Sequence, residues 1–143
     1  RSNGNGDALS RIGAQFILVG VIGWVVASGI SLAIAGSNLP PNQAVSLFGS
    51  LYSASLGIGT VAGIITGLGF LVFALALSTR EGYNKMAALV AAVAAIVAVV
   101  VTIIGGLDTS QLETMNLIVG ITFIVHAAWF FMLGRNLIQG KVA

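Results

Sequence analysis

The most constraining feature of this chain is a stretch of 68 residues, from Ile12 to Thr79, without Asp, Glu, Lys or Arg. Two later segments, 86–107 and 114–134, continue the pattern, and His126 is their only ionisable residue. Charged residues make up 7% of the 143 residues, whereas they are usually about a quarter of a soluble domain. So small a domain has too few polar side chains to cover its own surface. The composition therefore predicts helices surrounded by lipid or by other copies of the chain.

Turn-forming residues divide the apolar sequence into four predicted helices, which cover residues 8–35, 44–78, 85–104 and 111–138. The predicted fold is all-α, with four transmembrane-type helices arranged as two antiparallel hairpins. Residues 1–11 are expected to form a flexible polar tail, and residues 12–140 a single four-helix unit. A transmembrane barrel is rejected because its strands are about ten residues long and alternate in polarity, whereas these segments are longer and apolar on all sides.

Capping residues predict where three of these helices begin and end. Asp7 and Asn84 are expected to be N-caps, and the S-x-x-E pattern from Ser110 to Glu113 is expected to form a capping box. Gly105-Gly106 is expected to end the third helix. The second helix would be about 53 Å long, against about 30 Å for a bilayer core. Its first turns would therefore project beyond the lipid, or the helix would lie in a protein wall thicker than a bilayer. Alternatively, its glycines would allow a bend.

The basic residues predict the orientation of the chain in a membrane. All six lie near the two termini or in the link between the second and third helices: Arg1, Arg11, Arg80, Lys85, Arg135 and Lys141. The positive-inside rule then predicts an integral membrane protein with both termini in the cytoplasm. In a virion or filament wall, the alternative location, the same pattern would give a slab with one basic rim.

Small residues at a spacing of four predict close helix packing, which is how helices associate inside lipid. Three such strips are present, and their members are Gly23, Ala27 and Ser31 in the first helix, Ser55, Gly59, Gly63 and Gly67 in the second, and Ala87, Ala91 and Ala95 in the third. Each strip offers a smooth face on which another backbone can approach closely.

The fourth helix carries larger side chains, and Trp129, Phe130, Phe131 and Arg135 are predicted to anchor it at the membrane interface. His126 is its one candidate for a haem ligand, a metal ligand or a proton relay, and the alternative is a structural histidine bonded to a neighbouring helix. No catalytic residue, metal site or cofactor is predicted. The absence of a basic run also leaves no specific nucleic-acid site.

The leading functional hypothesis is therefore a non-catalytic structural protein that packs into a larger homo- or hetero-oligomer. Its partners would be lipid, copies of itself or other membrane subunits. In composition and layout the chain resembles the very hydrophobic helical-hairpin coat proteins of spindle-shaped archaeal viruses, and this architectural resemblance implies a capsid or filament protomer as one alternative. A small transporter or channel lined by Gly, Ser and Thr, and a haem- or quinone-associated redox subunit using His126, are further alternatives.

Overall fold

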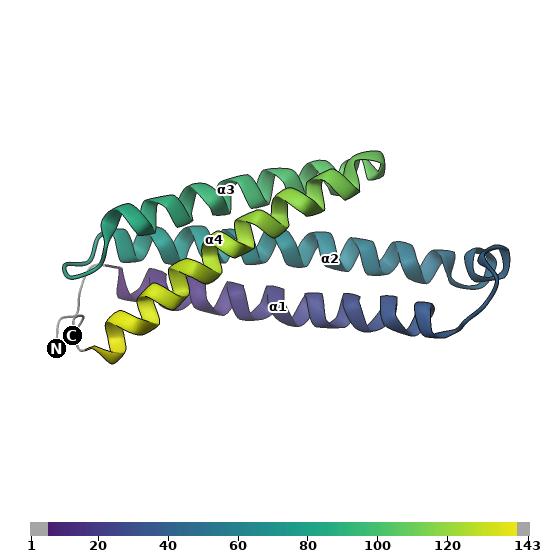
Figure 1. Cartoon of the computed structure of the whole chain (residues 1–143), viewed down its shortest axis with the longest axis horizontal. Helices are drawn as coiled ribbons and strands as arrows, with labels where there is room; N and C mark the ends of the chain where they lie inside the picture. Colours follow the sequence, from purple (N-terminus) through teal and green to yellow (C-terminus); the bar gives the residue numbers. More distant parts are fainter. Residues whose placement is uncertain (1–5, 140–143) are drawn as a thin grey trace.

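The computed structural model describes residues 6–139, and within that range the chain is all-α (Figure 1). The long helices are α1 (Asp7–Gly36), α2 (Pro41–Ser78), α3 (Lys85–Leu107) and α4 (Leu112–Ile138), and a short 3-10 turn, η1 (Thr109–Gln111), precedes α4. All four long helices have the length and apolar composition needed to cross a membrane. The prediction of an all-α fold with four transmembrane-type helices is therefore confirmed.

The beginnings of α1 and α2 differ from the predicted boundaries. Asp7 is the first residue of α1 rather than its N-cap, and the predicted flexible tail is therefore helical from this residue onward. Residues 1–5 of that tail lie outside the described residues. The Asp7 carboxylate instead pairs with the guanidinium of Arg80 in the α2–α3 link. α2 begins three residues early, at Pro41, because proline lacks the N–H that the first helical turn cannot use.

The α3–α4 connection also differs from its prediction. α3 continues through Gly105-Gly106 to Leu107, since both glycines keep helical conformation there. The predicted Ser110–Glu113 capping box does not form, and the Asp108 carboxylate accepts the bond from the Ser110 backbone N–H at 3.0 Å. The Asn84 cap of α3 is confirmed, because its side chain accepts from the Ala87 N–H at 3.1 Å.

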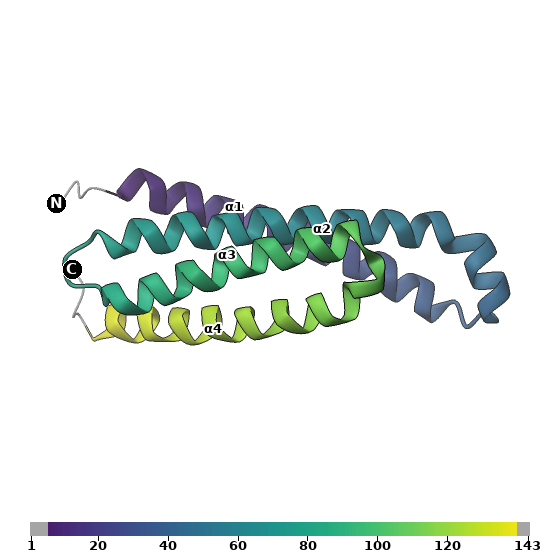
Figure 2. The same cartoon turned by 90° about the horizontal axis from the view of Figure 1, so that it is seen from above.

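Consecutive helices run in opposite directions and lie side by side (Figures 1 and 2). α1 packs on α2, α2 on α3, and α3 on α4, with the most extensive contact between α1 and α2. The predicted division into two hairpins is not confirmed as such, since α2 also packs extensively against α3.

A repeat of seven residues brings α1 and α2 together. Gly6 lies against Ala76, Gly13 against Gly69, Gly20 against Ala62, and Ala27 against Ser55; we call these four pairs the α1–α2 seam. An apolar repeat of seven keeps one face of each helix turned toward its partner when two helices wind around each other. A Cβ atom on Gly13 would lie only 2.8 Å from the Gly69 carbonyl oxygen, so the close approach requires glycine there.

α2 and α3 meet on another face of α2, where glycines again lie against side chains. A Cβ atom on Gly63 would be 3.0 Å from Cγ2 of Thr102, and one on Gly67 would be 2.6 Å from Cγ2 of Val99. Gly106 of α3 in turn lies against Thr60. α2 is therefore the central helix, with small residues turned toward both of its neighbours.

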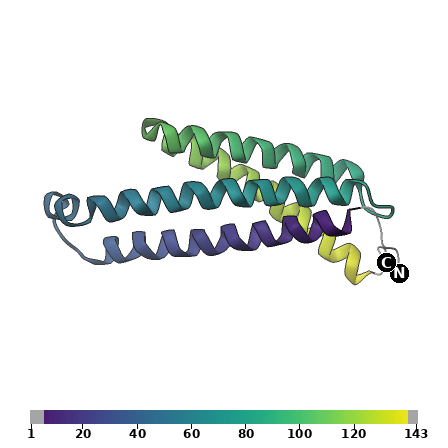
Figure 3. The same ribbon diagram turned by 180° about the vertical axis from the view of Figure 1, so that it is seen from behind.

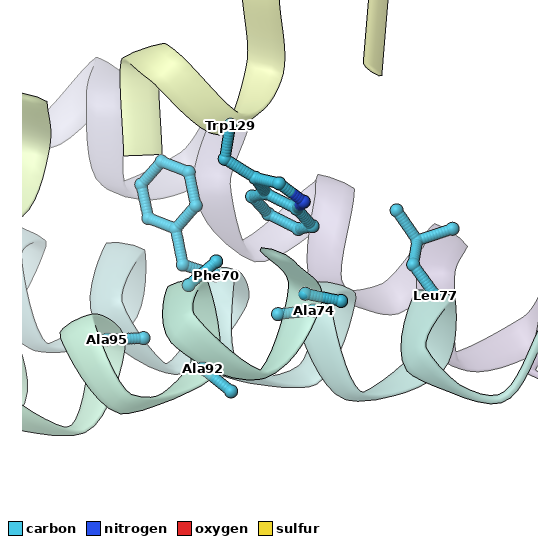
Figure 4. Packing of buried hydrophobic residues seen from close by; sticks show 8 residues of the cluster. Phe70, Ala74, Leu77, Ala92, Ala95 and Trp129 are labelled. Atoms are coloured by element: carbon cyan, nitrogen blue, oxygen red, sulfur yellow. The ribbon is translucent and has the colours of Figure 1, made fainter. Parts of the chain in front are cut away.

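The hydrophobic core lies in the half of the molecule near the α2–α3 link. Phe70, Ala74 and Leu77 of α2 pack against alanines of α3 and against Trp129 of α4 (Figure 4). Ala91 and Ala95 have no exposed surface, which allows the aromatic side chains of α2 and α4 to lie close to the α3 backbone. Small side chains on α3 thus make room for large ones on its neighbours.

At the opposite end, α1 and α2 extend beyond the α3–α4 connection (Figure 3). The first turns of α2 bend away from the axis of the rest of this helix (Figures 1 and 2). Val45 and Leu47 in these turns are 73% and 64% exposed. The bend lies before Gly57, the first of the glycines that were expected to allow one, and the straight part of α2 is shorter than its 38 residues imply.

Candidate functional site

A cleft of about 560 Å³ lies among all four helices, in the half of the molecule away from the hydrophobic core. Its walls combine apolar side chains, such as Leu32, Leu112 and Met115, with hydroxyl and amide groups. The polar side chains that line it are Ser28, Ser31, Ser55, Thr60, Thr102 and Asn116. No lining residue carries a charge. The cleft is therefore suited to a neutral molecule that forms hydrogen bonds and also has an apolar part.

The serine pair of the cleft is held by the helices themselves. The Ser55 hydroxyl donates to the Ala27 carbonyl oxygen at 2.8 Å, and the hydroxyl oxygens of Ser31 and Ser55 are 3.0 Å apart. Since Ser55 uses its proton on Ala27, Ser31 donates to Ser55 and keeps its own oxygen free to accept. Thr60 likewise donates to the Leu56 carbonyl oxygen at 2.9 Å. These hydroxyls present acceptors to the cleft.

Donors come from the other polar residues of the wall. The side chains of Ser28, Thr102 and Asn116 form no hydrogen bond with another residue in the part of the chain that the structure describes. Ser28 and Asn116 are also exposed. A polar group facing lipid or an apolar cleft without a partner is costly, so a molecule that satisfies these groups would be stabilised there.

Trp24 closes the inner end of the cleft. Its indole N–H donates to the Gly59 carbonyl oxygen at 3.0 Å, which fixes the ring between α1 and α2. Its ring centroid is 4.7 Å from that of Phe123 in α4. Phe123 in turn packs edge-on against Phe70 of the hydrophobic core. The aromatic side chains thus separate the cleft from the other half of the molecule.

His126 is buried beneath this aromatic group rather than facing the cleft. Its Nε2 lies 3.1 Å from the Ala91 carbonyl oxygen, so the N–H at this position is the donor. Its ring stacks on Phe70 with centroids 4.0 Å apart, and the residue is 1% exposed. One ring face and one nitrogen are therefore engaged by protein groups, and the buried imidazole is not presented to a haem. No group of three metal-ligating side chains occurs within residues 6–139.

Two acidic residues lie close in sequence to residues that line the cleft. Asp108 follows α3 and Glu113 lies in the first turn of α4, next to the lining residue Leu112. Hydrogen bonds from the side chains of Ser110 and Gln111 hold the pKa of Asp108 below its ordinary value. Asp108 is therefore ionised throughout the neutral range, and the end of the molecule that holds the cleft carries negative charge.

The structure uses most of the predicted small-residue strips within one chain. Gly63 and Gly67 face α3, while Gly59 and Ser55 face α1, with Gly59 open enough that an added Cβ would only touch Ala27. Gly23 contacts Ala62 of α2.

Of the remaining residues in the small-residue strips, some are buried in helix contacts and others stay exposed. Ser31 bonds to Ser55 yet stays exposed, while Ala91 and Ala95 are buried in the core with Ala87 at its edge. Sequence reasoning missed Gly13 and Gly20, which make the tightest contacts of α1 with α2. Their spacing of seven residues, shared with Ala27, was the signal.

The predicted interface anchors separate into buried and exposed residues. Trp129 is 4% exposed and packs against Phe73 inside the molecule, so its prediction as an anchor is wrong. Phe130 contacts Phe70 and is partly exposed, whereas Phe131 is 74% exposed and free to meet lipid. Arg135 lies in the last turn of α4. Position along α4 does not tell which way a side chain points.

Comparisons with protein-family models, curated proteins and solved structures found no match to this chain.

Proposed function

We propose that the protein is a non-catalytic structural subunit embedded in a membrane, and that α1 forms its outward contact face. The observation that carries this proposal is the exposed surface of α1. This helix packs mainly on α2, and only 11% of the residues in its most apolar part are buried. Leu18, Val25 and Leu32 lie at a spacing of seven and are 55%, 67% and 72% exposed. Such a face is stable only against lipid or another apolar protein surface.

The packing inside the chain supports the same proposal. Because Gly59, Gly63, Gly67 and Gly69 of α2 already lie against α1 or α3, further contacts would be made by large side chains of α1 rather than by the small-residue strips. The proposed partners are lipid, further copies of the chain or other membrane subunits. We place the termini in the cytoplasm, because Arg11, Arg80, Lys85 and Arg135 lie at the end of the molecule opposite the cleft.

Insertion and orientation are tested by labelling with a membrane-impermeant maleimide, for which the natural chain offers no cysteine. Single cysteines are introduced at Thr109, in the α3–α4 connection, and at Glu81, in the α2–α3 link; both positions are exposed. Thr109→Cys should react in intact cells, and Glu81→Cys only after the cells are permeabilised. Labelling of both in intact cells, or recovery of the protein without detergent, would contradict the proposal.

Assembly is tested by measuring particle mass in lipid nanodiscs. Val25→Trp places a bulky ring on the α1 face, and Ile124→Trp is the matched control on α4, where Ile124 is 70% exposed. We expect an oligomer that Val25→Trp dissociates and Ile124→Trp leaves intact. A monomer in the unchanged protein would refute the assembly role. Native particles are also viewed by electron microscopy, and a regular filament or shell would favour the coat-protein alternative.

A small transporter is the second candidate function, and the polar cleft is the observation that favours it. The aromatic group of Trp24, Phe123 and Phe70 closes the inner end of the cleft, so passage of a solute would require these rings to move. Liposomes containing the protein should then release a small neutral polyol such as glycerol faster than empty liposomes. Equal rates of release would rule against transport of such solutes.

A further inference from the structure

The cleft lies at a defined depth if the protein spans a membrane as proposed, and the inference below rests on that placement. α3 has 23 residues and is about 35 Å long, close to the thickness of a bilayer core. The α3 residues that line the cleft, Val101 to Gly105, are within about 10 Å of Asp108 along the helix. The cleft is therefore at the boundary between hydrocarbon and headgroups, where the glycerol units of lipids lie.

The wall of the cleft matches the chemistry of a glycerol unit. Ester, ether and hydroxyl oxygens of such a unit accept hydrogen bonds, and Ser28, Thr102 and Asn116 have donors that no described residue uses. Ser31 and Thr60 offer acceptors for a free hydroxyl. The volume of about 560 Å³ lies in the usual range of small-molecule sites and is large enough for a glycerol unit with the first carbons of its chains.

Charge decides between classes of lipid. No basic residue lines the cleft, and Asp108 and Glu113 lie on the turns that flank it. These carboxylates are within about a Debye length of a headgroup at the opening, so they would repel phosphatidylglycerol and other anionic lipids. A lipid with no net charge meets no such repulsion.

We propose that the cleft binds the glycerol unit of one membrane glycerolipid that carries no net negative charge. Its acyl chains leave between α1 and α4, where Leu32 and Met115 provide apolar walls. The bound lipid lies at the end of the molecule where α4 runs beside α3 and away from α1 (Figures 1 and 3). The site thus joins two helices that have little direct contact with each other.

The test is native mass spectrometry of the full chain after extraction from membranes in detergent. Dioleoylglycerol and dioleoyl-phosphatidylglycerol are added separately at equal concentration. We expect one dioleoylglycerol to remain bound per chain, and phosphatidylglycerol to bind about fivefold less, given the usual effect of one or two charges at a membrane surface. Equal binding of both lipids, or retention of neither, would overturn the proposal.

Two variants locate the bound lipid, each with a matched control. Ser28→Phe fills the cleft, and Val26→Phe adds the same ring outside it on the same helix, at a side chain that is 48% exposed and is not one of the contact-face residues Leu18, Val25 and Leu32. Asn116→Leu removes the amide at constant size, and Thr114→Leu is its control outside the cleft on α4. Ser28→Phe should abolish retention, Asn116→Leu should weaken it about tenfold, the value of one lost hydrogen bond in an apolar site, and both controls should bind as the unchanged protein does.

The helical signal in the circular dichroism spectrum of each variant distinguishes loss of lipid binding from loss of the fold. If Ser28→Phe fails to fold, Asn116→Leu alone tests whether the lipid binds in the cleft. Retention that survives both cleft variants would overturn the proposal. The same preparation tests the membrane location separately. Protein found in the soluble fraction contradicts the membrane role itself, whereas detergent-extracted protein that retains no lipid contradicts the cleft assignment alone.

Discussion

Replacing Gly20 by alanine tests the register of the α1–α2 seam with the smallest possible change. A Cβ atom at this position would overlap the Thr66 hydroxyl and lie 2.7 Å from the Ala62 carbonyl oxygen. Ordinary contact begins at 3.4 Å, so the α2 backbone would have to retreat by about 0.7 Å. The Thr66 hydroxyl, which donates to the Ala62 carbonyl at 2.8 Å, would also have to turn away.

Overpacking of this kind costs about 1 to 3 kcal/mol. Alanine favours a helix by up to about 1 kcal/mol relative to glycine, which opposes that cost. We therefore expect Gly20→Ala to lower the free energy of unfolding by up to about 2 kcal/mol, and to be about 1 to 3 kcal/mol less stable than a variant that gains the same helix propensity without the overlap. Gly29→Ala is the control on the same helix, because an added Cβ there has no neighbour within 4 Å. That variant should be unchanged or slightly more stable.

The assay is unfolding by sodium dodecyl sulfate in mixed micelles, followed by circular dichroism. A double-mutant cycle with Thr66→Ala adds a second measurement, since removal of the hydroxyl relieves part of the overlap while leaving the contact with the Ala62 carbonyl. The two changes should therefore be less harmful together than the sum of their separate effects. Equal stability of Gly20→Ala and Gly29→Ala would show that the two helices do not meet in this register.

Three further predictions concern other parts of the molecule. Gly63→Leu should lower the free energy of unfolding by about 1 to 3 kcal/mol without preventing membrane insertion, because the added side chain must displace Thr102; the same micelle titration and a membrane fractionation measure the two effects. His126→Leu should lower the same free energy by about 1 to 2 kcal/mol through loss of the bond to the Ala91 carbonyl, and an unchanged value would show that this bond contributes nothing. The Ser110 amide resonance should titrate with a midpoint below 3.8 and stay constant in Asp108→Asn. Because the folded pKa of Asp108 is lowered, its hydrogen bonds stabilise the connection at neutral pH, and that contribution is lost as the pH falls below 3.8.

The helices were predictable from sequence because their causes are local. Absence of charge, the length of the apolar runs and the Asn84 cap all act within one segment, and none of them depends on a partner. Pro41 and Gly105 show the limit of this reasoning. Proline and glycine are turn residues in general, yet proline is also accepted at the start of a helix, and glycine is accepted inside one that is packed.

Pairing between helices was predicted less well, because small residues at spacings of four and of seven lie on overlapping faces of a helix. Gly23 and Gly20 both satisfy such a pattern, and only the position of Ala62 on the neighbouring helix distinguishes their contacts. The prediction of Trp129 as an interface anchor was wrong for a related reason, since the depth of a residue in a membrane does not specify its rotation about the helix axis. The cleft depends on how all four helices tilt, and no single segment encodes that.

The seven-residue repeat of the seam has a consequence for how the first two helices find each other. If α2 slid along α1 by one repeat, Gly13 would meet Ala76, Gly20 would meet Gly69, and small residues would again face small residues. Side-chain size alone therefore leaves two neighbouring alignments close in energy. Between α1 and α2 there are only four residues, 37–40, and the bend that starts α2 follows immediately.

So short a connection cannot supply the roughly 10 Å that one repeat would require. The turn that ends in Pro40 and Pro41 thus limits how far α2 can shift along α1, and it selects one of the two alignments that are close in energy. An insertion of seven residues there would release the alternative alignment, whereas other lengths would bring glycines against bulky side chains.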